Sequence, residues 1–389
     1  MPDSSRRNFL LAGLAAPAVA SAARGGADDK QQAKTPHAPV VSPGLRYRTL
    51  GKTGLKVTTV GFGCMITSDA SVIERAADIG ITYFDTARVY QSGNNERMVG
   101  AALKGKRQSI TLSSKSGSKT KEAALADLDT SLRELGTDHL DIWYLHAKTT
   151  AAEIKDELID AQQTAKKAGK IRFAGVSTHS GQAELIPALT ANPNIDVILT
   201  AYNFSMGDKL EAALAAAHAA GKGVVAMKVM AGGFRFAKEG SKLYDTFKKD
   251  GALLAALRWV LKSPDVDTTI PSMTDMDQLD ENLKAMTGGF TKSDEALLAR
   301  QLEYIAPLYC RMCGQCAGTC ERGLPVADIL RYLTYADGYG QFSLGREHFL
   351  ALPAEVAQVR CNECPACTVE CPHGVRVVER LSRAQDIFA

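Results

Sequence analysis

A chain of 389 residues, 45% of them hydrophobic, is long enough to bury one large core and a second, smaller one. Its formal net charge of +3 is close to neutral for this length, and no stripe of Lys and Arg is interleaved with aromatic residues. Nucleic acid is therefore not an expected partner. Of the nine cysteines, eight fall in two tight runs after residue 309, which favours metal ligation over disulfide bonding.

The first 22 residues have the features of an export signal. Paired arginines in Ser5-Arg6-Arg7-Asn8-Phe9-Leu10 precede an apolar run from Phe9 to Ala22, and Ala20-Ser21-Ala22 fits a cleavage site. The run is too short to span a bilayer, so no stable membrane span is expected. The pattern resembles a twin-arginine signal and predicts export of the folded chain to the periplasm. A disordered basic start or an uncleaved anchor is the alternative. Residues 23–45 are predicted to be a disordered linker.

The chain from Tyr47 to about Gly288 alternates short apolar runs with longer stretches of helical periodicity. The expected helices include Lys121–Leu135, Ala151–Ala168, Leu210–Ala220 and Ala252–Leu261. The expected strands are Val57–Phe62, Ile81–Asp85, Ile110–Ser114, Leu140–His146, Ile171–Ser177, Val197–Ala201, Gly223–Met227 and Thr268–Ile270.

Eight strands, each followed by a helix-like segment, predict an α/β fold of the (β/α)8 TIM barrel type over residues 46–290. A doubly wound open sheet is the alternative for the same alternation. That fold favours a Gly-x-Gly-x-x-Gly turn after an early strand, and Gly61-Phe62-Gly63-Cys64 does not continue in that way.

Side chains capable of acid–base chemistry follow three successive strand candidates. Asp85 ends the second strand and Tyr90 lies in the loop after it, while Lys115 follows the third strand and His146 ends the fourth. Because the carboxyl ends of parallel strands meet at the mouth of a barrel, we expect the four side chains to lie together there. Singly, three of the four have a structural explanation: Asp85 as a helix N-cap or a turn former, Lys115 as a solvated lysine and His146 as a strand-end histidine.

Together the four groups are suited to carbonyl chemistry. A tyrosine has an ordinary pKa of about 10, and an ammonium beside it is expected to lower that pKa. A carboxylate next to the ammonium keeps it charged and in place. An imidazole can donate a hydrogen bond to a carbonyl oxygen or shuttle the proton. The set predicts a site that polarises and protonates a carbonyl while a hydride arrives at its carbon.

The segment from Tyr47 to Met286 resembles the aldo/keto reductase superfamily. In that family Asp85, Tyr90, Lys115 and His146 match a catalytic tetrad with the tyrosine as proton donor. The resemblance implies a small carbonyl or alcohol substrate and a nicotinamide dinucleotide across the barrel mouth. The motifs that carry it, in family order, are Arg48-Thr-Leu-Gly-Lys-Thr-Gly-Leu-Lys-Val57, which looks like the opening hairpin, Gly61-Phe-Gly-Cys-Met65, Phe84-Asp-Thr-Ala87, Asn95-Glu96 with Gly100, and Ser131-Leu-Arg-Glu-Leu-Gly-Thr-Asp138.

The resemblance also implies which residues contact the dinucleotide. Gly175-Val-Ser177-Thr178 matches the segment that holds the carboxamide, although the family usually has Asn at position 178. Ile270-Pro-Ser272 with Gln278, Glu281 and Asn282 matches the adenine end. The expected contacts are Gly63, Ser177, Thr178, Met227, Lys228, Ser272, Gln278 and Asn282.

Two departures from the family bear on the cofactor. Members that prefer the 2′-phosphorylated dinucleotide usually carry basic residues where Ser272, Met273 and Gln278 stand, so either NAD or NADP is expected. Met227 stands where many members stack an aromatic ring on the nicotinamide, and a thioether covers that ring less specifically.

The two cysteine runs share one spacing, which is that of the bacterial ferredoxin site for a [4Fe–4S] cluster. They predict two [4Fe–4S] clusters in a ferredoxin-like domain over residues 291–389, with zinc as the alternative. The expected ligands are Cys310, Cys313, Cys316 and Cys320 in the first run and Cys361, Cys364, Cys367 and Cys371 in the second.

In two-cluster ferredoxins the fourth cysteine of each run ligates the other cluster. By that pattern Cys320 serves the second cluster and Cys371 the first. The stretches Leu324–Tyr335 and Ser343–Leu352 between the runs are expected to be helical, so the domain is predicted to be mainly helical. The layout resembles the exported, ferredoxin-like branch of the aldo/keto reductases. Cys64 stands alone and is expected to be a small apolar core residue.

The leading hypothesis is an oxidoreductase that exchanges hydride between a nicotinamide and a carbonyl or alcohol, with two clusters relaying electrons to or from a redox protein partner. A second hypothesis is an electron-transfer or partner-binding protein whose barrel is only a scaffold. A third makes the clusters purely structural. A hydride carries two electrons and a cluster one, and the sequence shows no flavin motif to couple them.

Overall fold

The computed structural model describes residues 44–233, 242–249 and 251–389. The predicted signal peptide and all but the last two residues of the predicted linker lie outside these ranges. The described residues belong to one compact unit. Within the described ranges no helix is both long enough and apolar enough to cross a membrane.

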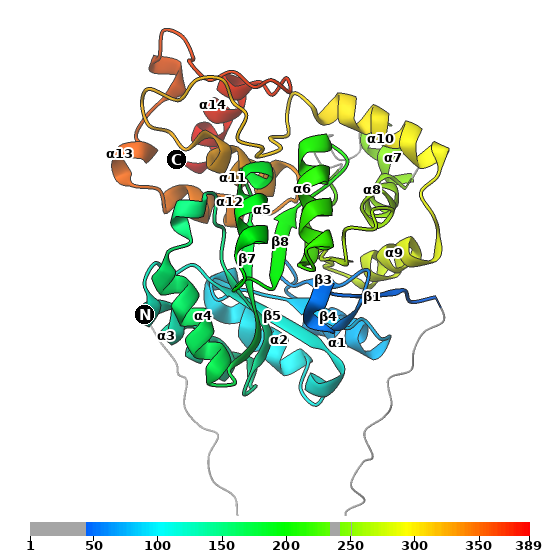
Figure 1. The fold of residues 1–389 in the computed structure, drawn as a ribbon. Coiled ribbons are helices and arrows are strands. Elements are labelled where there is room, and N and C mark those ends of the chain that lie inside the picture. The colour runs from blue at the N-terminus through cyan, green and yellow to red at the C-terminus, as the bar shows by residue number, and fades with distance from the viewer. Residues whose placement is uncertain (1–43, 234–241, 250) are drawn as a thin grey trace, which may run out of the picture. The chain divides into compact units, whose positions relative to one another are not determined.

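Eight parallel strands form the closed sheet at the centre of this unit (Figure 1). They are hydrogen-bonded in sequence order, and backbone bonds from Gly61 to Thr269 and from Gly63 to Pro271 join the last strand to the first. The predicted (β/α)8 barrel is therefore confirmed. The strands are β3 (Phe62–Gly63), β4 (Tyr83–Asp85), β5 (Thr111–Ser116), β6 (Leu140–Leu145), β7 (Ile171–Thr178), β8 (Val197–Ala201), β9 (Gly223–Met227) and β10 (Thr268–Thr269).

The first predicted strand, Val57–Phe62, is wrong in part. Its beginning lies in β2 (Lys56–Thr58), which pairs antiparallel with β1 (Tyr47–Thr49), and only its end enters the barrel as β3. This hairpin is the one expected from the family resemblance. Leu50, Leu55 and Val57 of the hairpin region pack against the inward-facing residues of the strands and so cover the amino end of the barrel.

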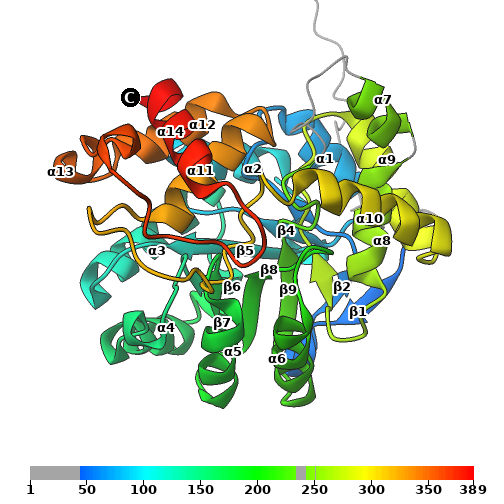
Figure 2. The same cartoon turned by 90° about the horizontal axis from the view of Figure 1, so that it is seen from above.

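Helices connect the strands on the outside of the barrel, as Figure 2 shows for α3, α4, α5 and α6. The prediction of one helix over Ala151–Ala168 is wrong in detail, because a short 3-10 turn (Ala151–Glu153) precedes α4 and the chain is extended at Lys155. The helices are α1 (Ala70–Asp78), α2 (Asn94–Ala102), α3 (Lys121–Leu135), α4 (Asp156–Lys167), α5 (Gln182–Ala191), α6 (Asp208–Ala219), α7 (Lys242–Lys249), α8 (Ala252–Leu261) and α9 (Met276–Thr287).

The apolar residues of the strands serve two cores. In β6, Ile142 and Tyr144 face the barrel interior, whereas Trp143 and Leu145 pack against the surrounding helices. The alternation follows from the two-residue period of a strand. Inside the barrel the hydroxyls of Tyr83 and Tyr144 lie 2.8 Å apart, so these buried phenols satisfy each other. Cys64 is fully buried among apolar residues, as predicted.

The C-terminal part is mainly helical. Its helices are α10 (Lys292–Ile305), α11 (Val326–Asp337), α12 (Phe342–Leu350), α13 (Ala354–Ala357) and α14 (Val377–Phe388). Helices α11, α12 and α14 share a core of their own that includes Leu333, Phe349 and Phe388. Helix α10 lies beyond the predicted domain boundary at residue 290, yet it packs against α8 of the barrel.

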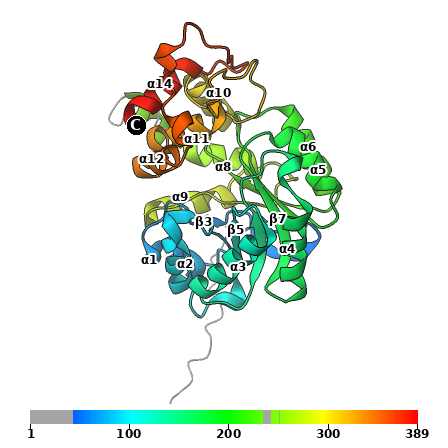
Figure 3. The same cartoon turned by 90° about the vertical axis from the view of Figure 1, so that its left-hand side faces the viewer.

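The C-terminal part contacts loops at the carboxyl ends of the strands (Figure 3). The backbone N–H of Gly181, after β7, donates to the carbonyl of Met312 between two predicted ligand cysteines. Gly338, just after α11, lies so close to Gly232, after β9, that a Cβ atom there would be 2.3 Å from the Gly232 carbonyl oxygen. The mouth of the barrel is therefore covered by the C-terminal part.

Substitution of Gly338 tests this close packing. The variant Gly338→Ala should lose about 1–3 kcal/mol of unfolding free energy, because the added methyl group meets backbone that cannot move as a side chain can. Gly289→Ala is the matched control, since a Cβ there meets no atom within 4 Å. Denaturant unfolding measures both. Equal stability of the two variants would contradict tight contact between α11 and the β9 loop.

Candidate active site

The structure brings Asp85 and Lys115 into direct contact at the ends of neighbouring strands. Lys115 Nζ donates to Asp85 Oδ2 at 2.5 Å and to the Thr86 carbonyl at 2.7 Å, while the Ser113 hydroxyl donates to Asp85 Oδ1 at 2.6 Å. Asp85 is 1% exposed and Lys115 is 2% exposed. Burial opposes both charges, raising the pKa of Asp85 and lowering that of Lys115. The ammonium and carboxylate therefore depend on each other.

Tyr90 lies in the loop after β4 and points at this pair. Its hydroxyl is 3.3 Å from Lys115 Nζ, and the ammonium is 4.8 Å from the centre of its ring. The ring of His146, after β6, meets the Tyr90 ring edge-on at 6.0 Å between centroids. The four side chains predicted to meet at the barrel mouth do lie together.

The loop that presents Tyr90 has an unusual backbone. Gln91 and Ser92 both have positive φ, at 51° and 53°, a conformation that is uncommon for residues with side chains. The Gln91 amide donates to the Thr67 carbonyl at 2.8 Å, and Arg88 forms a salt bridge with the buried Glu96. These contacts hold the loop, and hence the phenol, in place.

The pKa of Tyr90 differs from the sequence-based expectation. Instead of falling beside Lys115, it is raised well above its ordinary value, first by burial and then by the negative charge of Asp85. A phenolate is poorly solvated in this enclosed site, and that effect outweighs the neighbouring ammonium. Burial, together with the charges of Lys115 and Arg331, also lowers the pKa of His146 well below its ordinary value. Tyr90 is thus a protonated phenol and His146 a neutral imidazole.

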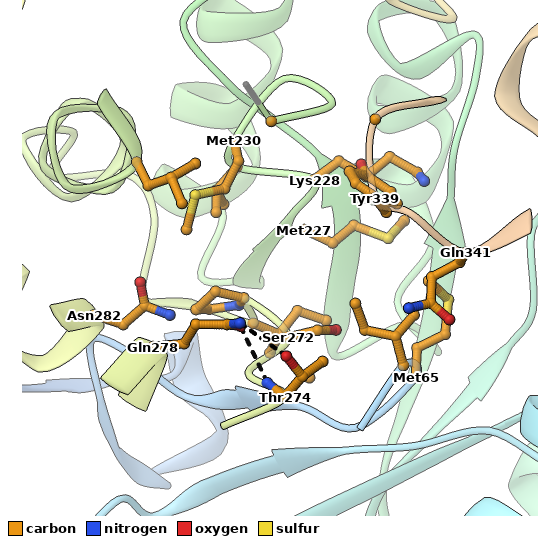
Figure 4. Close-up of a pocket in the computed structure, with 18 of the residues that line it drawn as sticks. Met65, Met227, Lys228, Met230, Ser272, Thr274, Gln278, Asn282, Tyr339 and Gln341 are labelled. Atoms are coloured by element: carbon orange, nitrogen blue, oxygen red, sulfur yellow. Dashed lines mark hydrogen bonds between the residues drawn. The ribbon is translucent and has the colours of Figure 1, made fainter. Parts of the chain in front are cut away.

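A cavity of about 530 Å³ adjoins Asp85 and Tyr90 and extends toward α9. Six of the eight expected cofactor contacts line it, and Figure 4 shows five of these on its walls. They are Gly63, Met227, Lys228, Ser272, Gln278 and Asn282.

The other two expected contacts, Ser177 and Thr178, do not line the cavity. Ser177 Oγ accepts a hydrogen bond from the Ala147 backbone N–H at 2.8 Å, and Thr178 Oγ1 donates to the Ser180 carbonyl at 2.9 Å. These hydroxyls secure the loops after β6 and β7. Met273 is fully buried, so it cannot reach a ligand in the cavity.

Sequence reasoning missed residues that complete the mouth. His179, after β7, lines the cavity, and its ring lies 6.1 Å from that of His146. Tyr339 lines the cavity from the C-terminal part, and Tyr335 of α11 stacks on it at 6.0 Å. His179 stands two residues after Ser177 in a matched motif and could have been suspected. Nothing in the local sequence places α11 over the barrel.

The cysteine runs lie side by side in the C-terminal part. Ala317 and Glu370 exchange two backbone hydrogen bonds of 2.9 Å, which pair the two runs. The pKa of Cys310 is raised to about 12 by burial and then by the nearby Cys316, Cys313 and Cys371. The pKa of Cys361 is raised to about 11 by burial and then by Cys320, Cys364 and Cys367.

Cys310 and Cys361, each with the cysteines that act on its pKa, form two sets of four. Each set contains the first three cysteines of one run and the fourth cysteine of the other run. Four thiols in each set are the donors that a [4Fe–4S] cluster requires. Among the residues that the structure describes, however, no three or more His, Cys, Asp or Glu side chains lie close enough together to hold a metal ion. The donor type and the pairing fit such clusters, while the metal sites themselves stay a prediction.

Comparison with known proteins decides the family. The model of the aldo/keto reductase family matches residues 67–300, which is more than half of the chain. The chain belongs to the aldo/keto reductase family. It is an NAD(P)-dependent oxidoreductase of that type.

Known proteins are similar to this aldo/keto reductase over part of its length. "Uncharacterized oxidoreductase YqkF" of Bacillus subtilis is 34% identical over 151 residues, which span 34% of this chain but only 49% of that protein. "L-galactose dehydrogenase" of Arabidopsis thaliana is 26% identical over 286 residues, covering 62% of this chain and 88% of that one. The match to the structure of aldo-keto reductase AKR11C1 from Bacillus halodurans in its holo form covers 66% of this chain and 96% of that one, with a TM-score of 0.57 and 28% identity.

The buried ion pair of this aldo/keto reductase can be tested by stability. Asp85→Asn should lower the unfolding free energy by about 3–5 kcal/mol, because Lys115 is left as a buried, unpaired ammonium. Asp78→Asn is the control, since the Asp78 side chain is exposed and its pair with Lys106 is worth about 0–1 kcal/mol. Urea unfolding compares them. A similar small loss in both variants would show that the barrel mouth does not depend on the buried pair.

Proposed function

We propose that this protein reduces a small carbonyl compound, or oxidises the corresponding alcohol, at the barrel mouth with Asp85, Tyr90, Lys115 and His146 as its catalytic tetrad. The observation that carries the proposal is the contact between Lys115 and both Asp85 and Tyr90 at the edge of a cavity large enough for substrate and cofactor. Four such groups are not needed to stabilise a barrel.

The tetrad handles the proton of the reaction. Tyr90, which burial keeps protonated, donates its proton to the carbonyl oxygen as that oxygen becomes an alkoxide. Lys115 stabilises the phenolate that remains, and Asp85 keeps Lys115 charged. Neutral His146 donates a hydrogen bond that orients the carbonyl. In the direction of oxidation the same groups act in reverse.

The residues along the cavity fit a nicotinamide dinucleotide, which when bound supplies the hydride to the carbonyl carbon. Met227 would lie at the nicotinamide end, and Ser272, Gln278 and Asn282 at the adenine end (Figure 4). Gly63 lines the cavity beside Ser272. Asp275, Asp277 and Glu281 also line the cavity beside Gln278. Carboxylates there oppose a 2′-phosphate, so we propose NAD as the preferred dinucleotide.

The eight cysteines would hold two [4Fe–4S] clusters, which exchange single electrons with a redox partner. The pairing of the runs through Ala317 and Glu370 supports cross-ligation, in which Cys371 joins the first set and Cys320 the second. The twin-arginine pattern supports export to the periplasm after the clusters have been inserted. An exported enzyme would carry its dinucleotide tightly bound.

The alternative of a scaffold barrel that only supports electron transfer draws on one observation. Met227 stands at the nicotinamide end, where it covers the ring without the specificity of an aromatic side chain. The assembled tetrad opposes this reading, because a scaffold has no need for a buried lysine beside a phenol.

The role of Tyr90 is tested by removing its hydroxyl. Tyr90→Phe should slow carbonyl reduction by about 10²–10⁴-fold, because the proton donor is lost while the fold is kept. Protein purified folded from its host should release NAD on denaturation. Tyr47→Phe, on the β1–β2 hairpin, is the control and should retain full activity. Equal rates for Tyr90→Phe and the wild type would exclude the tetrad mechanism.

Cross-ligation is tested with paired cysteine variants. Cys310→Ala with Cys371→Ala should reduce iron from about eight to about four atoms per chain, because both residues serve one cluster. Cys310→Ala with Cys320→Ala should remove nearly all iron, because each residue serves a different cluster. Iron and acid-labile sulfide are measured per chain. The reverse result would show that each run binds its own cluster, and zinc in place of iron would exclude the clusters.

A further inference from the structure

Helix α11 places a buried phenol between two cations above the cavity. Tyr335 is 2% exposed, and Arg331 Nη1 donates to its hydroxyl at 3.2 Å. On its other side, Lys228 Nζ lies 4.9 Å from the centre of the Tyr335 ring and 5.8 Å from that of Tyr339. Figure 4 shows Lys228 and Tyr339 together on the wall of the cavity. The C-terminal part and the β9 loop therefore build this corner jointly.

The charges in this corner do not balance. Lys115 is paired with Asp85, and Arg331 bonds Asp328 at 2.7 Å. For Lys228, the interactions within the described parts of the chain are with phenols, and no carboxylate is among them. Burial, and then the neighbouring cation Arg331, lower the pKa of Lys228, so an anion beside Lys228 would stabilise its ammonium form.

The state of Tyr335 reflects this excess of positive charge. Burial raises its pKa, but Lys228 and Arg331 lower it by more, so the pKa of this phenol falls below its ordinary value. The histidines that face the corner, His146, His179 and His348, have lowered pKa values, so they are neutral rings that neither add to nor cancel its positive charge. The corner therefore favours an anion.

His179 provides a buried polar atom on the same cavity. Its Nδ1 atom is buried and makes no hydrogen bond to any residue that the structure describes, while the side chain lines the same cavity as Lys228 and Tyr90. A buried polar atom without a partner costs free energy unless a ligand satisfies it. A carboxylate has two oxygens, which would satisfy His179 Nδ1–H and Lys228 Nζ together.

We propose that Lys228 and His179 bind a carboxylate group of the substrate, so that the enzyme prefers carbonyl compounds that carry a carboxylate. Arg331 and Tyr335 are positioning residues, because they set the place and charge environment of Lys228 from α11. The carboxylate lies on the Lys228 side of the cavity while the carbonyl faces Tyr90. This inference rests on the proposed carbonyl reduction and names its substrate class.

A matched pair of four-carbon aldehydes tests the proposed preference for a carboxylate. Succinic semialdehyde carries a carboxylate and butanal does not. The wild type should have a kcat/KM about 10- to 100-fold higher for succinic semialdehyde, as expected for a charge-assisted contact. In Lys228→Met this ratio should fall close to one, whatever the absolute rates, whereas Lys228→Arg should keep it above one.

Lys248→Met is the matched control. Lys248 of α7 also lines the cavity but is exposed, so its loss should leave the ratio high. An equal fall in both lysine variants would mean that a diffuse positive field, and not the Lys228 corner, selects the anion. A wild-type ratio near one, or a ratio unchanged in Lys228→Met, would overturn the proposal. If Lys228 contacts only the dinucleotide, Lys228→Met lowers kcat/KM by the same factor for both aldehydes. Their ratio is then unchanged, and the proposal is overturned.

Calorimetric binding separates this inference from the proposed function. Butanoate should bind the wild type and bind about 10-fold or more weakly to Lys228→Met, while 1-butanol should not distinguish them. If neither aldehyde is reduced but butanoate binds the wild type more tightly than Lys228→Met, the proposed carbonyl reduction is wrong and the anion site is supported. If the aldehydes are reduced but butanoate binds both proteins equally, the anion site fails and the reduction stands.

Discussion

The contact between Asp85 and Lys115 is the interaction on which the candidate active site depends. Each charge alone would be strongly opposed by burial, and together they persist at the ends of β4 and β5. The parallel register sets Asp85 beside Ser113 and Lys115 beside Tyr144, so the sheet itself brings the two charges into reach. Tyr90 then needs only a short loop to meet the ammonium.

The loop after β4 that presents Tyr90 has a backbone conformation that costs free energy. Gln91 and Ser92 adopt backbone conformations that are uncommon for their residue types, and they do so next to the phenol. The buried Glu96, held by Arg88 and Ser114, anchors the first turn of α2 directly behind them. The stable sheet and helices thereby maintain a loop that would not keep this shape alone.

The C-terminal part changes the chemistry of the mouth as well as its shape. Arg331 acts on the pKa of both Tyr90 and His146, although it lies about 240 residues further along the chain than Tyr90. Tyr339 and the backbone around Gly338 close one side of the cavity. A barrel without this cover would have a more open and better solvated mouth. The part that carries the cysteine runs is therefore also a wall of the proposed substrate site.

The sequence by itself determined the barrel and the meeting of the four residues of the proposed tetrad, because both arise from local patterns. Apolar runs of strand length at regular spacing specify the strands, and a polar residue at the end of each run must lie at the mouth of a parallel barrel. The helices Lys121–Leu135 and Ala252–Leu261 were predicted with their observed bounds for the same reason. The split of the first strand was missed, since pairing with β1 depends on a partner and not on periodicity.

Only the tertiary structure decided what surrounds the tetrad. The raised pKa of Tyr90 comes from burial, and burial depends on segments that are distant in sequence. The positions of Lys228, Tyr335 and Arg331 around one corner follow from the packing of α11 on the β9 loop, which no local pattern records. The meeting of the four side chains could thus be predicted from residue order, whereas the charge and enclosure of the proposed substrate site required contacts between the barrel and the C-terminal part.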